Sequence, residues 1–109
     1  MSCKILTTPQ FAKEIKKLSK KFKSIKKDLS QLIERLEENP TEGTSLGNSC
    51  YKIRVANSSI PTGKSGGFRV ITYFLDSDNN LYLLSIYSKT EKGTISDKEL
   101  LEILGVLDF

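Results

Sequence analysis

Residues 68–87 read FRVITYFL-DSDNN-LYLLSIY. Two β-prone runs, 68–75 and 81–87, lie on either side of a cluster of turn-forming aspartate, asparagine and serine residues. These residue types accept the backbone conformations of tight turns, so the pattern is typical of two strands joined by a short connection. We therefore predict a β-hairpin over residues 68–87.

A third strand is predicted before this hairpin. Apolar and charged residues alternate over 51–56, which puts Lys52 and Arg54 on the same face of that strand. The polar, glycine-containing stretches on either side of it, 41–49 and 57–67, are expected to be loops.

Two amphipathic helices are predicted earlier in the chain, after a short strand at 4–7. Thr8 at the N-cap and Pro9 at the first helical position begin the first helix, and Ser24 can cap the second. Apolar residues at helical spacing give each helix one stripe to bury. These stripes are Phe11, Ile15, Leu18 and Phe22 in the first helix, and Ile25, Leu29, Leu32, Ile33 and Leu36 in the second.

The order of predicted elements is β-α-α-β-β-β-α, because a capping box at 96–99 begins a short C-terminal helix. This order indicates an α+β fold: a small antiparallel sheet with the N-terminal helical hairpin packed on one face, and a short C-terminal helix. We expect residues 1–109 to form a single domain, since 109 residues suit one compact unit.

The chain contains no histidine, which excludes Ser-His-Asp and Cys-His nucleophiles and histidine-ligated zinc. Its two cysteines, Cys3 and Cys50, are too few for a disulfide framework and are expected to be small buried residues in a reducing cytosol. No metal or cofactor is expected. No apolar run is long enough for a membrane span, and the N-terminal residues lead into no signal-like segment, so we expect a cytoplasmic protein without membrane contact.

Charge is strongly segregated along the sequence. Residues 1–27 carry nine lysines and one acid, whereas residues 51–75 carry four cations and no acid. An acid-free stretch of this length favours a polyanionic partner more strongly than the net charge of +4 does. The lysines at 13–27 are equally well explained as a solvated helix face.

A candidate site is spread over the three main strands. In an antiparallel sheet its members could converge on the face not covered by helices, where arginine would hold a phosphate and tyrosine would stack or donate a proton. A lysine among other cations loses its proton more easily and can act as a general base. RNA supplies its own nucleophile, the 2′-hydroxyl, so histidine is not required. The candidate residues are Lys52, Arg54, Arg69, Tyr73, Tyr87 and Lys89.

Two other motifs are weaker evidence of function. Gly63-Lys64-Ser65 resembles the end of a phosphate-binding P-loop, but Ser58 stands where the first glycine is needed and a strand follows instead of a helix. The segment is better interpreted as a flexible basic loop between two strands, and Lys64 on it is a candidate RNA-binding residue. Asn57-Ser58-Ser59 matches a glycosylation sequon, which has no meaning in a protein that stays in the cytosol.

The order of several short segments resembles the RelE/ParE superfamily of toxins from bacterial type II toxin–antitoxin modules. The resemblance is closest to the HigB-like branch, and it lies in YKIRVA (51–56), GKSGGFRVI (63–71), YFLD (73–76), YLL (82–84) and IYSKTE (86–91). The chain departs from the RelE branch at Thr90, where that branch has an arginine, and has no tyrosine after Tyr87.

The resemblance implies a toxin that enters the ribosomal A site and cuts mRNA, and that a cognate antitoxin, often of helix-turn-helix type, neutralises. It assigns catalysis to Lys52, Arg54, Arg69, Tyr87 and Lys89, with Arg69 at the scissile phosphate. RNA binding would fall to Lys52, Arg54, Lys64 and Tyr73.

Two rival functions remain open at this point: a ParE-like inhibitor of DNA gyrase, and a catalytically inactive protein that binds an antitoxin. The lysine-rich segment 13–27 also fits two partners, because it could receive an acidic antitoxin segment or grip ribosomal RNA.

Overall fold

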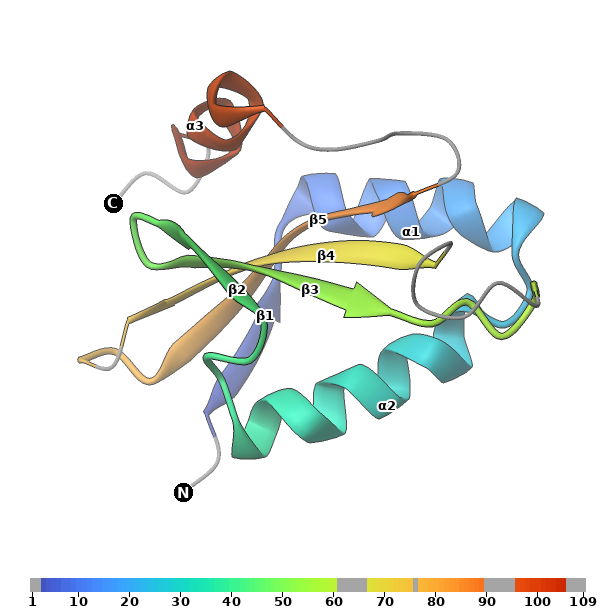
Figure 1. The fold of residues 1–109 in the computed structure, drawn as a ribbon, viewed down its shortest axis with the longest axis horizontal. Coiled ribbons are helices and arrows are strands. Elements are labelled where there is room, and N and C mark those ends of the chain that lie inside the picture. The colour runs from blue at the N-terminus through green and yellow to red at the C-terminus, as the bar shows by residue number, and fades with distance from the viewer. Residues whose placement is uncertain (1–2, 61–66, 76, 90–95, 106–109) are drawn as a thin grey trace.

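The computed structural model describes residues 3–60, 67–75, 77–89 and 96–105 (Figure 1). Its elements follow in the order β1 (Lys4–Thr7), α1 (Pro9–Lys21), α2 (Ile25–Glu38), β2 (Thr44–Gly47), β3 (Cys50–Val55), β4 (Phe68–Leu75), β5 (Asn80–Ser88) and α3 (Asp97–Gly105). This confirms the predicted α+β class, with one strand more than expected. The described helices are all too short or too polar to cross a lipid bilayer.

The five strands form one sheet in the order β1-β5-β4-β3-β2. The predicted hairpin is β4 and β5, and both β3 and β2 continue the sheet in antiparallel fashion. β1 pairs with β5 in parallel. The helical hairpin follows β1 in the chain and leads to β2, at the opposite edge of the sheet.

The stretch 41–49, expected to be a loop, contains β2. This strand is held by its pairing with β3, in which Thr44 lies opposite Lys52 and Ser45 opposite Tyr51. Asn48 and Ser49, with φ of 53° and 62°, make the tight turn between the two strands. A strand that is short, polar and at the sheet edge has no apolar alternation, so periodicity could not reveal it.

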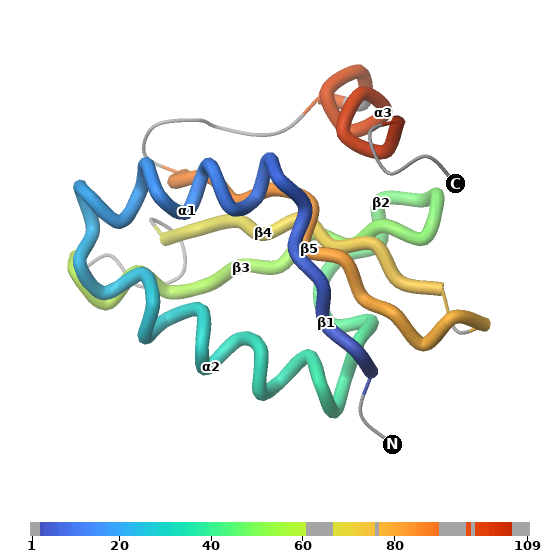
Figure 2. The backbone as a smooth tube through the Cα atoms, turned by 180° about the vertical axis from the view of Figure 1, so that it is seen from behind, coloured from blue at the N-terminus to red at the C-terminus, as the bar shows by residue number. Residues whose placement is uncertain are grey.

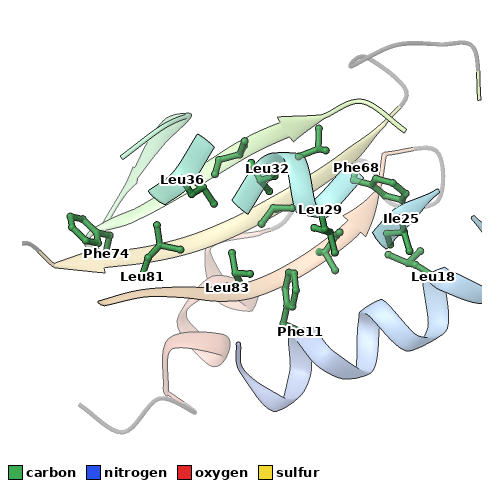
Figure 3. Close-up of a cluster of buried hydrophobic side chains, with 14 of the residues drawn as sticks. Phe11, Leu18, Ile25, Leu29, Leu32, Leu36, Phe68, Phe74, Leu81 and Leu83 are labelled. Carbon is green, nitrogen blue, oxygen red and sulfur yellow. The ribbon is translucent and has the colours of Figure 1, made fainter. Parts of the chain in front are cut away.

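Helices α1 and α2 run in opposite directions across one face of the sheet (Figure 2). Their apolar stripes meet side chains from β3, β4 and β5 in the main core (Figure 3). The Thr8 hydroxyl caps α1 as predicted, since it accepts the backbone N–H of Phe11 at 3.1 Å. Ser24 precedes α2 but makes no capping bond, and its hydroxyl binds the Asp28 and Asn57 side chains instead.

Helix α3 covers part of the opposite face, which we had expected to be free of helices. Its Leu100 and Ile103 pack with Cys50, Ile71 and Leu84 in a second, smaller cluster that also includes Tyr87. The predicted capping box begins this helix: the Ser96 hydroxyl accepts the Glu99 N–H at 3.1 Å, and the Glu99 carboxylate accepts the Ser96 N–H at 3.3 Å.

Candidate functional site

Three of the predicted site residues form a row across the sheet. In the strand register, Arg54 of β3 lies opposite Arg69 of β4, and Arg69 lies opposite Tyr87 of β5. Their neighbours Val55 and Val70 point into the core beneath the helical hairpin, so strand alternation turns the row toward the other face. We call Arg54, Arg69 and Tyr87 the cross-strand row.

Arg69 is the buried centre of this row, with 4% of its surface exposed. One guanidinium nitrogen donates to the Phe68 carbonyl at 3.2 Å. Burial lowers the pKa of Arg69, the neighbouring Arg54 lowers it further, and Tyr87 acts in the opposite direction. The guanidinium nevertheless stays charged at neutral pH, so the row holds a partly desolvated positive charge.

Lys52 and Arg54 extend the basic surface toward the sheet edge. Arg54 is exposed and Lys52 half-buried, and both line an open pocket of about 430 Å³ together with Glu42, Gly43 and Thr44. Gly43 has φ of 106°, and a Cβ at this position would lie 2.5 Å from the Lys52 carbonyl oxygen. The chain can therefore pass this close to β3 only with a glycine there.

Tyr87 and Lys89 bound the other end of the row. Tyr87 is 7% exposed and packs in the cluster that α3 covers. Lys89 follows the end of β5, and its backbone N–H donates to the Gly67 carbonyl at 2.9 Å. This bond ties the residue after β5 to the residue before β4, and so keeps Lys89 at the end of the sheet where Arg69 lies.

Tyr73 does not join the row. It lies four residues from Arg69 on β4, roughly 13 Å along the strand. There it pairs with Cys50 in the register and packs against Tyr82, with ring centroids 6.3 Å apart. Burial is the main cause of its raised pKa. Tyr73 shares this face of the sheet with the cross-strand row but lies apart from it, and Lys64 lies outside the described residues.

The sequence analysis missed two parts of this site. Glu42 and Thr44 line the pocket beside Lys52, but they lie in the stretch interpreted as a loop. The only local signal for that hairpin was Gly47-Asn48 directly before a β-prone run. The contribution of α3 to the Tyr87 environment had no signal, because it depends on which face of the sheet the helix covers.

The chemistry available at the row is that of cations and a phenol. Two guanidinium groups supply planar forks of N–H donors suited to a phosphate. The phenolic oxygen of Tyr87, on the side of Arg69 away from Arg54, is itself buried. Cys50 adds no nucleophile, since burial raises the pKa of its thiol to about 11.

Comparisons with known proteins agree on one family. The sequence matches, over residues 3–106, the family described as the RelE toxin of the RelE/RelB toxin–antitoxin system. A double arginine-to-alanine variant of the E. coli toxin RelE in the free state is similar in fold, with a TM-score of 0.64, 16% identity, and coverage of 96% of this chain and 97% of that one. The isolated E. coli RelE toxin has a TM-score of 0.56, 20% identity, and coverage of 96% and 99%. The intact E. coli RelBE toxin–antitoxin complex has a TM-score of 0.59 and 18% identity, with coverage of 78% of this chain and 94% of that one.

Proposed function

The chain belongs to the RelE toxin family of toxin–antitoxin systems, and from that premise we propose that it is a ribosome-dependent endoribonuclease that cuts mRNA in the ribosomal A site. The observation that carries this proposal is the cross-strand row. It sets two arginines, both from the acid-free stretch 51–75, opposite each other and puts a tyrosine beside Arg69. Like charges directly opposite each other on a sheet are unfavourable, and a bound anion reduces their repulsion.

The proposed reaction uses the 2′-hydroxyl of the RNA as its nucleophile. This oxygen attacks the adjacent phosphorus, the bond from phosphorus to the 5′ oxygen of the next nucleotide breaks, and a 2′,3′-cyclic phosphate forms. A base must take the proton from the 2′-hydroxyl, and an acid must give one to the leaving oxygen.

We assign the phosphate to Arg69 and Arg54, whose N–H donors would hold the negative charge that grows on its oxygens. Lys52 is the proposed base or RNA contact, and Lys89 a further cation at the same end of the sheet. Tyr87 would stack on a base or donate the proton. Lys64 and Tyr73 are proposed to contact RNA away from the reacting bond.

The proposed partners are the ribosome, its mRNA and a cognate antitoxin of the helix-turn-helix type, all met in the cytoplasm. The solved RelBE complex is similar in fold and contains an antitoxin, which supports an antitoxin partner. The HigB-like features of the sequence favour an antitoxin of the helix-turn-helix type.

A first test is made in cells, by inducing the protein without an antitoxin. We expect growth arrest together with new mRNA 5′ ends inside reading frames, and unchanged plasmid supercoiling. Relaxed or altered supercoiling with intact mRNA would indicate a gyrase inhibitor instead. Intact mRNA, normal supercoiling and no arrest would indicate an inactive antitoxin-binding protein.

Variants locate the activity in the row. Arg69→Ala should reduce cleavage by about 10²–10³-fold, as expected for the loss of a charge-stabilising donor. Arg54→Ala, at an exposed position, should also reduce cleavage and keeps the test usable if Arg69→Ala does not fold. Lys4→Ala, which removes an exposed cation from the far edge strand, should cleave normally. Full activity of both row variants would contradict the assignment.

A further inference from the structure

Strand β5 contains one more residue than β4 in the stretch where they pair. Leu83 lies opposite Thr72 and Ser85 lies opposite Ile71, although Thr72 and Ile71 are adjacent. Leu84 therefore has no counterpart in β4, and this extra residue is a β-bulge.

The bulge decides which side chain stands beside Arg69. With it, Tyr87 pairs with Arg69, while Ile86 pairs with Val70 and joins the core beneath the helical hairpin. Without the extra residue, every later residue of β5 would move by one position, and Ile86 would pair with Arg69. Tyr87 would then lie opposite Phe68, which points into that core. The bulge thus turns Tyr87 toward the cross-strand row.

Helix α1 and its N-cap hold the backbone groups of the bulge. The Thr8 hydroxyl donates to the carbonyls of Leu83 at 3.2 Å and Leu84 at 3.1 Å. Six residues further along, Glu14 accepts two hydrogen bonds at one carboxylate oxygen, from the Ser85 hydroxyl at 3.0 Å and from the backbone N–H of Ile86 at 3.2 Å.

The bond to Ile86 is the important one for Tyr87. Ile86 comes two residues after Leu84, and its N–H donates to this carboxylate on α1. Ile86 is 1% exposed and Ser85 3%, so water cannot easily replace the carboxylate. Removing the acceptor would take this hydrogen bond from a buried N–H directly before Tyr87 in the chain.

We propose that Glu14 is a positioning residue: it fixes the β5 bulge and thereby aims Tyr87 at Arg69. Its consequence for catalysis rests on the proposed function, whereas its consequence for the position of Tyr87 does not. Glu14 lies on α1 on the helix side of the sheet, and we infer that it acts on the row through the backbone of Ile86.

The test compares Glu14→Met, which keeps the length of the side chain without an acceptor, with Glu14→Gln, which keeps a carbonyl acceptor. Glu34→Met on the exposed surface of α2 is the matched control. Amide exchange of Ile86 and the nuclear Overhauser contacts between Tyr87 and Arg69 are measured by NMR. In Glu14→Met we expect the amide of Ile86 to exchange at least about tenfold faster and the Tyr87–Arg69 contacts to weaken. In Glu14→Gln and Glu34→Met the exchange rate and the contacts should stay close to those of the wild type.

Cleavage kinetics form the second arm. Glu14→Met should lower kcat roughly ten- to a hundredfold with little change in KM, because Tyr87 is misplaced while phosphate binding is retained. In a Tyr87→Phe background the same substitution should cost little more, whereas a general loss of stability would cost as much as before. Ser85→Ala should leave kcat nearly unchanged, since the Ile86–Glu14 hydrogen bond stays in place. If Glu14→Met does not fold, the proposal still requires that Ser85→Ala and Glu14→Gln keep the Tyr87–Arg69 contacts.

Unchanged Ile86 exchange and intact Tyr87–Arg69 contacts in Glu14→Met would overturn the proposal, and so would loss of those contacts in Glu14→Gln. A wild-type protein that cleaves no RNA would overturn the proposed function, and the NMR comparison would still decide the role of Glu14.

Discussion

At the scale of single residues, the opposition of Arg54 and Arg69 is the most informative feature. Residues directly opposite on an antiparallel pair have Cβ atoms about 5 Å apart, and like charges at that distance repel. Arg69 is also desolvated, which lowers its pKa and strengthens the repulsion. Such an arrangement lowers the free energy of unfolding and favours the binding of an anion.

This predicts that Arg54→Gln is slightly more stable than the wild type. At low ionic strength its free energy of unfolding should rise by about 0.2–1 kcal/mol in urea titrations. Inorganic phosphate should raise the Tm of the wild type by more than that of the variant.

Lys52→Gln is the matched control, because Lys52 lies opposite the uncharged Ile71 and Thr44. It should show a smaller gain. A less stable Arg54→Gln at low salt would contradict the electrostatic reading of the row.

At the scale of elements, a buried carboxylate joins the helical hairpin to the end of β3. Asp28, 4% exposed, accepts the Ser24 hydroxyl at 3.0 Å, the Ser58 hydroxyl at 2.8 Å and the Ser58 N–H at 3.1 Å. Asn57 accepts from Ser24 at 3.1 Å and from the Ser59 N–H at 2.9 Å. The segment that leaves β3 is therefore fixed to the start of α2.

We predict that Asp28→Ala lowers the free energy of unfolding by about 2 kcal/mol or more, since it leaves several donors without their charged acceptor. Asp28→Asn should fall between this variant and the wild type. Urea unfolding followed by circular dichroism measures the loss, with the exposed Glu34→Ala as control. A loss below about 0.5 kcal/mol, the usual range of surface substitutions, would show that this network does not hold the elements together.

Much of the element order could be predicted from sequence, because helical periodicity and strand alternation are local properties. Ser24 shows where locality fails. Its type predicts an N-cap, but folding brings Asn57 and Asp28 within reach of its hydroxyl, and these partners replace the helix N–H groups.

The site was predictable in part for the same reason. Alternation correctly put Lys52 and Arg54 on one face, but it carries no information on register. The register of β3, β4 and β5, with its bulge, puts Arg69 between Arg54 and Tyr87 and leaves Tyr73 away from them. The polar edge strand β2 has only Gly47-Asn48 as a local signal, and the placement of α3 has none.

At the scale of the whole molecule, basic residues lie on both sides of the sheet. The exposed lysines of α1 lie on the helix side, and the cross-strand row lies on the other. Under the proposed function, the lysines of α1 would bind the ribosome and the cross-strand row would act on the mRNA. The lysines of α1 equally fit an acidic antitoxin segment. The proposed cleavage depends on the row alone: its cations and its tyrosine, without histidine, would act on RNA that supplies its own 2′-hydroxyl as nucleophile.

The most direct measurement is cleavage of a defined mRNA by the purified protein on programmed ribosomes. One substrate is all-ribose, and a matched one has a single 2′-deoxynucleotide immediately 5′ of the cut. We predict cleavage of the first, ending in a 2′,3′-cyclic phosphate, no cleavage of the second at that position, and none of the first by Arg69→Ala. Cleavage of the deoxy-substituted mRNA at the same bond, or undiminished cleavage by Arg69→Ala, would contradict the account.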